Sequence, residues 1–79
     1  MKKVIVYTGE FCPYCTLVKN FLKEHNIEFT ERDVQNDQSA YKELIEKTGQ
    51  NGIPVLDIEG KIIIGFNETE IKKELDLNE

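Results

Sequence analysis

Short stretches of apolar or alternating side chains predict four strands. Residues 3–7 are a continuous apolar run with β-branched side chains, which is typical of a strand buried on both faces, as in a parallel sheet. Residues 27–32 alternate apolar and polar side chains, which indicates a strand with one exposed face at an edge of the sheet. Residues 55–58 and 61–64 predict two more strands, and Glu59-Gly60 between them is a tight connection typical of a hairpin.

A helical spacing of apolar residues follows the first strand. This helix is predicted to begin at or near Cys12, with Pro13 at its first position, where the missing N–H costs nothing. It is predicted to end at His25-Asn26, because Asn tolerates the left-handed conformation of a helix end. Its apolar positions are Leu17, Val18, Phe21 and Leu22.

Two further helices are predicted from spacing and end signals. The second has Asn36 or Asp37 as its N-cap and stops at Gly49. Its apolar stripe is predicted to consist of Tyr41, Leu44, Ile45 and Thr48. The third is a short last helix with Asn67 as N-cap and Glu70 three residues on, a variant of the capping box. Its buried stripe is predicted to consist of Ile71 and Leu75.

The order of these elements is βαβ, then α, then ββα, and it indicates one α/β domain over residues 1–79. The βαβ crossover makes the first two strands parallel, with a right-handed connection. The hairpin makes the last two strands antiparallel. We therefore expect one mixed sheet of four strands, with three helices distributed over both faces.

Composition and charge exclude several classes of partner. The net charge is −5, whereas binding to nucleic acid requires clustered lysine and arginine, so we expect no nucleic-acid partner. No apolar run approaches the ~20 residues of a membrane span, and no signal peptide is recognisable at the start. We therefore expect a cytoplasmic protein with no membrane partner. In that compartment, a CxxC pair is more often redox-active or metal-binding than structural.

The chain has two cysteines, Cys12 and Cys15, one helical turn apart where the first strand passes into the first helix. A bridge between them closes so small a loop that a purely structural disulfide explains the pair poorly. If Cys12 is the N-cap, its sulfur can accept hydrogen bonds from the N–H groups of the second and third helical residues, and the helix dipole favours its thiolate. The pKa of Cys12 should then fall below the free value of ~8.5. Cys12 would attack a substrate disulfide, and Cys15, inside the helix, would resolve the mixed disulfide.

Metal binding is the alternative interpretation of the cysteine pair. Two thiolates do not complete a tetrahedral site, and the single histidine, His25, lies at the far end of the first helix, so we assign no metal ligand within one chain. A bridged dimer could supply four thiolates to zinc or to an iron–sulfur cluster. A binding module that carries such a group across a dimer is therefore the alternative function.

Ile53-Pro54 stands at the start of the third predicted strand, a position where proline is tolerated. A cis bond there would aim the backbone of Ile53 at an approaching ligand rather than into the sheet. An ordinary trans loop proline fits the spacing equally well. The residues alone leave both alternatives open.

With these motifs in place, the chain resembles a glutaredoxin of the dithiol Cys-Pro-Tyr-Cys type, or a glutaredoxin-like redoxin. The resemblance extends over essentially the whole chain. Its motifs are Tyr7-Thr8, Cys12-Pro13-Tyr14-Cys15, Gly52-Ile53-Pro54, Glu59-Gly60 and Gly65. It implies a thioredoxin-like fold with sheet order 2-1-3-4 and a cis peptide bond between Ile53 and Pro54.

The resemblance also implies dithiol–disulfide exchange that reduces protein or glutathione mixed disulfides, with Cys12 as nucleophile and Cys15 as resolving cysteine. It implies a substrate groove formed by Tyr14, the Ile53 backbone and the start of the last helix. The candidate substrate-binding residues are Phe11, Pro13, Tyr14, Ile53, Pro54, Gly65, Phe66 and Asn67.

The partners implied are disulfide-containing proteins and a source of electrons. The pair Gly65-Phe66 resembles the same stretch of glutaredoxin-like redoxins, which a thioredoxin-reductase-type flavoprotein reduces. The expected reductant is therefore either that enzyme or glutathione. The chain departs from the glutaredoxin pattern at Gly9, where a lysine is common, and at Asn67, where the family has an acidic residue nearby. We expect a monomer with no tightly bound cofactor.

Overall fold

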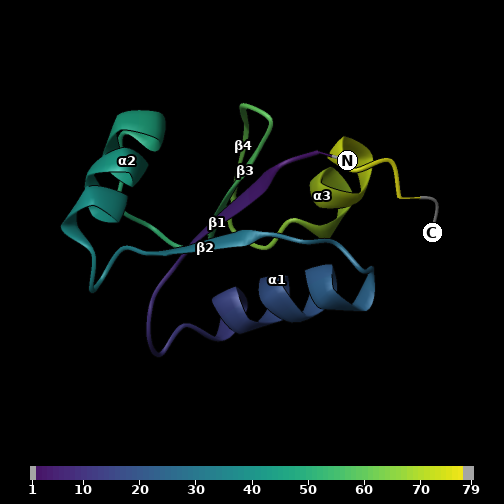
Figure 1. Cartoon of the computed structure of the whole chain (residues 1–79), viewed down its shortest axis with the longest axis horizontal. Coiled ribbons are helices and arrows are strands. Elements are labelled where there is room, and N and C mark those ends of the chain that lie inside the picture. The colour runs from purple at the N-terminus through teal and green to yellow at the C-terminus, as the bar shows by residue number, and fades with distance from the viewer. Residues whose placement is uncertain (1, 78–79) are drawn as a thin grey trace.

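A computed structural model of the chain describes residues 2–77, which form one four-stranded sheet and three helices (Figure 1). In chain order the elements are β1 (Val4–Thr8), α1 (Pro13–Glu24), β2 (Thr30–Asp33), α2 (Gln38–Thr48), β3 (Val55–Ile58), β4 (Lys61–Ile64) and α3 (Glu68–Glu74). This order confirms the predicted βαβ-α-ββα pattern.

The strands lie in the order β2-β1-β3-β4, which is the 2-1-3-4 order that the family resemblance implied. β1 is parallel to β2 and antiparallel to β3, and β3 is antiparallel to β4, so the sheet is mixed as predicted. In the hairpin, Glu59 and Gly60 both have positive φ, of 52° and 95°. Two such residues make the tight turn whose twist matches that of the flanking strands.

The predicted edge strand is confirmed as β2, but its start is corrected. The alternating pattern predicted a strand from residue 27, whereas β2 begins at Thr30, which pairs with Ile5. The reason is that Ile27 is still tied to α1, because its N–H donates to the carbonyl of Leu22 at 2.9 Å. Residues 27 and 29 are half-buried and pack against the core without joining the sheet.

The residues predicted to begin and end the helices do so in the structure. Cys12 is the N-cap of α1, Asp37 caps α2 and Asn67 caps α3, each by accepting a hydrogen bond from a backbone N–H with its side chain. Gly49 ends α2 in the left-handed conformation at φ 71°, and Asn26 adopts φ 58° just after α1. These local choices fix where each helix begins and stops.

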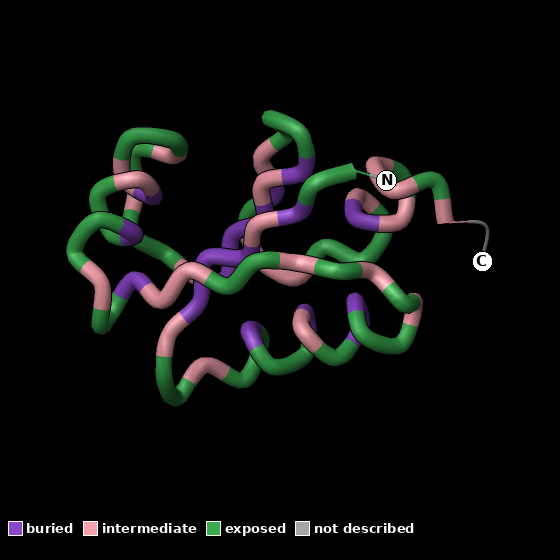
Figure 2. Tube along the Cα trace, viewed as in Figure 1, coloured by how far each residue is buried: buried purple, intermediate pink, exposed green. Residues whose placement is uncertain are grey.

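One face of the sheet is covered by α1 and α3, and the larger core lies there (Figure 2). Figure 2 shows the buried positions of α1 on the side that faces the strands. The buried members of this cluster are Val4, Val6, Val18, Phe21, Leu22, Leu56, Ile58, Ile63 and Ile71. Burial of these side chains contributes most of the stability of this face.

The opposite face carries α2, and its apolar contact is thin. The buried residues of α2 are Ala40 and Leu44, which pack on Tyr7, Val34 and Val55. The predicted stripe is therefore partly wrong, because Tyr41 is 43% exposed and Ala40 takes its place toward the sheet. The helix is rotated so that its longer polar residues, rather than the Tyr41 ring, reach back to the strands.

A polar network supplements this thin contact. The buried Tyr7 hydroxyl donates to Glu43 Oε1 at 3.0 Å and accepts from Lys47 Nζ at 2.5 Å. Lys47 Nζ also pairs with Asp57 Oδ2 at 2.7 Å, and Arg32 pairs with Glu43 Oε2 at 2.6 Å. The network thus ties α2 to β1, β2 and β3.

Burial opposes ionisation of Asp57, but hydrogen bonds from Lys47 Nζ and from the Gly60 N–H outweigh it and hold the pKa of Asp57 below its ordinary value. Burial likewise opposes the charge on Lys47, and its bonds to Asp57 and Tyr7 still raise the pKa of Lys47 above its ordinary value. The two groups therefore stay oppositely charged over the whole neutral range.

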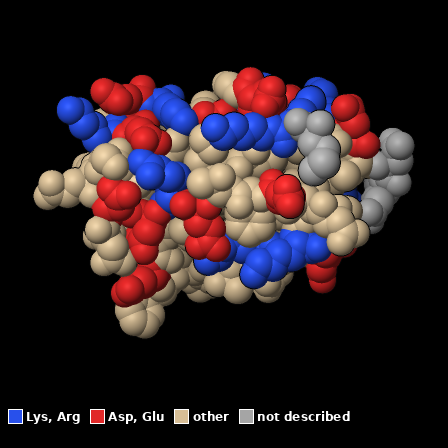
Figure 3. Space-filling view, viewed as in Figure 1, with Lys and Arg blue, Asp and Glu red and all other residues tan. Residues whose placement is uncertain are grey.

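Elsewhere, charged side chains of both signs are interleaved on the surface, as Figure 3 shows for one face. Within residues 2–77, no helix is both long enough and apolar enough to cross a membrane.

The Tyr7 hydroxyl is predicted to contribute more to the free energy of unfolding than the hydroxyl of Tyr41, an exposed tyrosine on the same side of the sheet. Tyr7→Phe removes one donated and one accepted hydrogen bond from a buried site and should lower the free energy of unfolding by about 1–2 kcal/mol in urea titrations. Tyr41→Phe, on the exposed side of α2, is the matched control and should change it by less than about 0.5 kcal/mol. Equal effects at the two positions would contradict the role of the network.

The network also predicts that part of the free energy of unfolding is lost in acid. Because the folded pKa of Asp57 is depressed below its ordinary value of 3.8, its contribution is complete above that value and is lost as the pH falls through the folded pKa. The difference in unfolding free energy between the parent protein and Asp57→Asn should be constant from pH 7 to about pH 5 and shrink below pH 4. Urea titrations at each pH measure it, and a difference that stays constant down to pH 2 would contradict the assignment.

Candidate functional site

The two cysteines form a disulfide at the start of α1, with Cα atoms 5.2 Å apart. Cys12 is the N-cap with extended backbone angles, φ −121° and ψ 95°, and Pro13 is the first helical residue. The Sγ atom of Cys12 accepts a hydrogen bond from the Cys15 N–H at 3.2 Å. The predicted N-cap position is confirmed, and of the two N–H donors predicted for the sulfur, that of the third helical residue is the one in contact.

The two sulfurs differ in access. Cys15 is 1% exposed and belongs to the buried side of α1 together with Val18 and Leu22. Cys12 is partly exposed. Of the two cysteines, Cys12 is therefore the one that a large partner molecule can reach.

The electrostatics of the helix start favour an anion at Cys12. The first turn of α1 contains no acidic side chain. The partial positive charge of the helix N-terminus is therefore not offset within that turn. In the reduced state, the Cys15 N–H that already contacts Cys12 Sγ would stabilise a thiolate there.

The Ile53–Pro54 bond is cis, as the family resemblance implied, and the residues alone had left this open. Pro54 immediately precedes β3, and Val55 of β3 pairs with Tyr7 near the end of β1. This pairing brings the Ile53–Pro54 loop to the end of β1 from which the chain runs to Cys12. The Gly65 N–H donates to the Pro54 carbonyl at 2.8 Å, so Gly65 joins the same end of the sheet.

Exposed apolar side chains lie close to the cysteines in the sequence. Phe11 is fully exposed and Tyr14 is 62% exposed, and Pro13 between them is also exposed. Leu17, one turn after Tyr14 on α1, is 46% exposed. These apolar side chains flank Cys12 in the sequence, and their exposure leaves them free for a partner to cover.

Two of the predicted substrate-binding residues have structural contacts of their own. The Phe66 ring packs edge-on against Phe21, with centroids 5.9 Å apart. The Asn67 side chain caps α3 by accepting from the Glu70 N–H at 3.2 Å. A contact of Phe66 or Asn67 with substrate stays a prediction.

His25, the single histidine of the chain, lies at the far end of α1 from the cysteines. His25 is the C-cap of α1, with its ring 4.3 Å from that of Phe21, so the helix separates it from Cys12. Among residues 2–77, no group of three or more His, Cys, Asp or Glu side chains is gathered in a way that could hold a metal ion.

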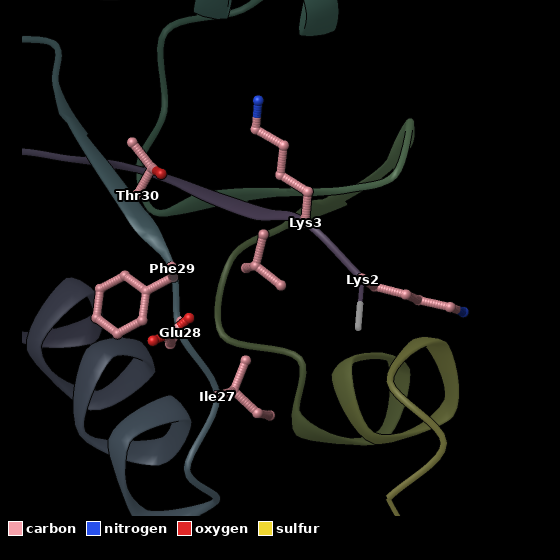
Figure 4. A pocket seen from close by; sticks show the side chains of 7 residues that line it. Lys2, Lys3, Ile27, Glu28, Phe29 and Thr30 are labelled. Carbon is pink, nitrogen blue, oxygen red and sulfur yellow. The ribbon is translucent and has the colours of Figure 1, made fainter.

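A hollow of about 670 Å³ lies at the other end of the sheet from the cysteines (Figure 4). Figure 4 shows Lys2 and Lys3 just before β1, across from Ile27, Glu28 and Phe29, with both lysine side chains directed away from these residues. Its walls are Lys2, Lys3, Val4, Ile27, Glu28, Phe29 and Thr30. None of the predicted site residues lines it.

The Thr8 hydroxyl is a feature near the site that sequence reasoning missed. Thr8 is 3% exposed, and among the described residues its Oγ1 is the one buried side-chain polar atom without a hydrogen-bond partner. Since side chains alternate along β1, Thr8 points to the same face as Val4 and Val6, toward α1. The sequence names Thr8 only as part of the Tyr7-Thr8 motif, because a threonine at the end of a strand carries no signal that its hydroxyl is buried.

Comparison with known proteins identifies relatives of this arrangement. The family model described as Glutaredoxin matches residues 4–63. A Clostridium pasteurianum protein described as an uncharacterized glutaredoxin-like 8.6 kDa protein in rubredoxin operon is 40% identical over 68 residues, which is 86% of this chain and 91% of that protein. A glutaredoxin of Vernicia fordii is 41% identical over 69 residues, covering 84% of this chain and 66% of its own. The crystal structure of a mutant of the thioredoxin-like protein BC3987 superimposes with a TM-score of 0.91 at 33% identity, over 99% of this chain and 100% of that one.

Replacing the unpaired Thr8 hydroxyl with a methyl group should stabilise the oxidised protein. Thr8→Val keeps the shape and removes a desolvated polar group, so the free energy of unfolding should rise by about 1 kcal/mol. In the control, Thr48→Val, the lost hydroxyl donates to the Leu44 carbonyl at 2.7 Å, and stability should fall by a similar amount. Urea titrations of both variants measure this, and a loss of stability in Thr8→Val equal to that of the control would show that the Thr8 hydroxyl is paired.

Proposed function

The chain belongs to the glutaredoxin family, and from that premise we propose that it is a dithiol–disulfide oxidoreductase working through a reversible Cys12–Cys15 disulfide. The observation that carries the proposal is the unequal placement of the two sulfurs. Cys12 is accessible at the N-cap of α1, and Cys15 is 1% exposed one turn inside. A purely structural disulfide would gain nothing from this asymmetry, whereas a nucleophile and a resolving cysteine need it.

In the reducing direction, the Cys12 thiolate attacks one sulfur of a substrate disulfide. The substrate S–S bond breaks, its second sulfur leaves as a thiolate that takes up a proton, and Cys12 is left in a mixed disulfide. Cys15 then loses its proton and its sulfur attacks Cys12 Sγ. The remaining substrate sulfur leaves and is protonated. Two electrons have then passed from the two cysteines to the substrate, with one proton released by Cys15 and the other taken from water, because Cys12 starts as a thiolate.

The start of α1 supports Cys12 in the first of these steps. The Cys15 N–H and the helix dipole lower the free energy of the Cys12 thiolate, so the attacking species is populated at neutral pH. The same interaction makes Cys12 the better leaving group when the first step runs in reverse. In the second step, where Cys15 attacks Cys12 Sγ, the leaving group is the substrate sulfur.

We assign disulfide-containing proteins and glutathione mixed disulfides as substrates of this site. The exposed Phe11 and Tyr14 support a polypeptide substrate, because they offer apolar contacts beside Cys12. The predicted groove adds Pro13, the Ile53 backbone before the cis Pro54, Gly65, Phe66 and Asn67. Regeneration in the cytosol would come from glutathione or from a thioredoxin-reductase-type flavoprotein.

The two cysteine roles predict opposite behaviour in two variants. Cys15→Ser keeps the nucleophile and removes the resolving sulfur, so a model substrate disulfide should accumulate as a mixed disulfide on Cys12, detected as a mass increase that dithiothreitol reverses. Cys12→Ser is the matched control and should accumulate almost none, because Cys15 is buried. Trapping on Cys15 in the control, or no trapping in Cys15→Ser while Cys12 still reacts with iodoacetamide, would contradict the assigned roles.

A further inference from the structure

A glutamine from another loop holds the segment that leads into the cysteine pair. The Glu10 N–H donates to Gln35 Oε1 at 2.8 Å, and Gln35 Nε2 donates to the Glu10 carbonyl at 3.4 Å. One side chain therefore satisfies both backbone groups of Glu10. Gln35 lies 25 residues away in sequence, between β2 and α2, so this contact joins two separate loops.

Gln35 is itself fixed to the end of β2. The Asp33 carboxylate accepts from the Gln35 N–H at 2.9 Å and from the Asn36 N–H at 3.2 Å. Asp33 in turn pairs with Thr8, the last residue of β1. The Gln35 amide is thus presented to Glu10 from the ordered end of the sheet.

Between Glu10 and Cys12 stands only Phe11, and within residues 2–77 it makes no hydrogen bond. Phe11 has φ 54°, which a residue with a side chain adopts only where its neighbours hold it, and its ring is fully exposed and makes no packing contact. The position of Cys12 is therefore set from two sides. The first turn of α1 holds it on one side, and the Gln35–Glu10 contact holds it on the other.

We propose that Gln35 is a positioning residue of the dithiol site. By holding the Glu10 backbone, it fixes the turn at Phe11 and keeps Cys12 in the N-cap geometry in which its sulfur accepts from the Cys15 N–H. This inference rests on the proposed exchange chemistry at Cys12 and adds a residue to it. Gln35 touches no reacting atom and acts through the Glu10 backbone.

Gly9 supports this role because it leaves room for the contact. A Cβ atom at Gly9 would lie 2.7 Å from both Cδ and Nε2 of Gln35 and 2.8 Å from Cδ1 of Ile53. These distances are shorter than side chains tolerate, so an added methyl group must displace both the Gln35 amide and the end of the Ile53 side chain. Gly9→Ala should therefore act on Cys12 partly by the same route as loss of Gln35.

The test is the pH dependence of Cys12 alkylation in the reduced full-length protein, with iodoacetamide as the probe and mass spectrometry locating the adduct. In Gln35→Ala, the pKa of Cys12 should rise, and the alkylation rate at pH 6 should fall about threefold to tenfold. Gln35→Met keeps the length and bulk but not the amide, and it should show the same fall. Gln38→Ala, at the exposed start of α2, is the matched control and should behave like the parent protein.

A double-mutant comparison separates positioning from general loosening. Gly9→Ala alone should also lower the rate. Added to Gln35→Ala, it should lower the rate by less than it does in the parent protein, because the Gln35 contact is already absent and only the Ile53 contact remains to be disturbed. The urea midpoint should stay unchanged in Gln35→Ala, since both hydrogen bonds lie at the surface. Parent-like rates in Gln35→Met, or additive effects of the two substitutions, would overturn the proposal.

The pKa of Cys12 in the parent protein separates a failure of the proposed function from a failure of the role assigned to Gln35. If parent Cys12 titrates like a free thiol near ~8.5, the proposed function loses its support. If parent Cys12 titrates well below that value and Gln35→Ala titrates identically, the exchange chemistry stands and only the role of Gln35 is refuted.

Discussion

The structure depends on one constraint, the need of an α-helix for a partner at its free N-terminal N–H groups. In α1 that partner is a sulfur atom, because Cys12 stands at the N-cap and accepts from the Cys15 N–H. A serine or an aspartate in this position would only cap the helix, whereas a cysteine turns the same interaction into a means of stabilising a thiolate. The helix also buries Cys15, so one element gives the two sulfurs their different chemical properties.

The rest of the fold serves to hold this helix start against the end of β1. The face of the sheet that carries α1 has the larger apolar core, which fixes the helix along its length. The opposite face holds α2 with few apolar contacts and with the network around Tyr7 and Lys47. Both arrangements converge on β1, one of the two central strands, whose last residue precedes the loop to Cys12. The cis Ile53–Pro54 bond and Gln35 reach that loop from the two flanking segments.

Much of this could be predicted from the sequence, because the signals are local. Pro13 after Cys12, Asp37 and Gly49 around α2, and Glu59-Gly60 in the hairpin each act through their own backbone, and all are where the pattern placed them. The predictions were wrong where a contact between residues far apart in the sequence decides the local structure. Residue 27 alternates like a strand residue but is bound to the end of α1, and Tyr41 fits a helical stripe but is turned outward while Ala40 packs.

The residues that sequence reasoning missed have no local signal. Gln35 stands in a polar loop among other polar residues, and only the folded sheet brings its amide to Glu10, 25 positions earlier. The unpaired hydroxyl of Thr8 and the pairing of Lys47 with Asp57 likewise arise from sheet register and helix rotation, which a single sequence does not encode in any short motif. The sequence therefore predicts which residues react, and the structure adds which residues hold them.

The central claim is that the N-terminus of α1 stabilises a thiolate at Cys12, and the reduction potential of the Cys12–Cys15 disulfide as a function of pH tests it most directly. Equilibration with a dithiol buffer of known potential measures it on the unmodified protein. The potential should fall by about 59 mV per pH unit at low pH and by about 30 mV per unit once Cys12 ionises, since one fewer proton is then taken up. The account predicts this break well below the free-thiol value of ~8.5, and a break at or above that value would contradict it.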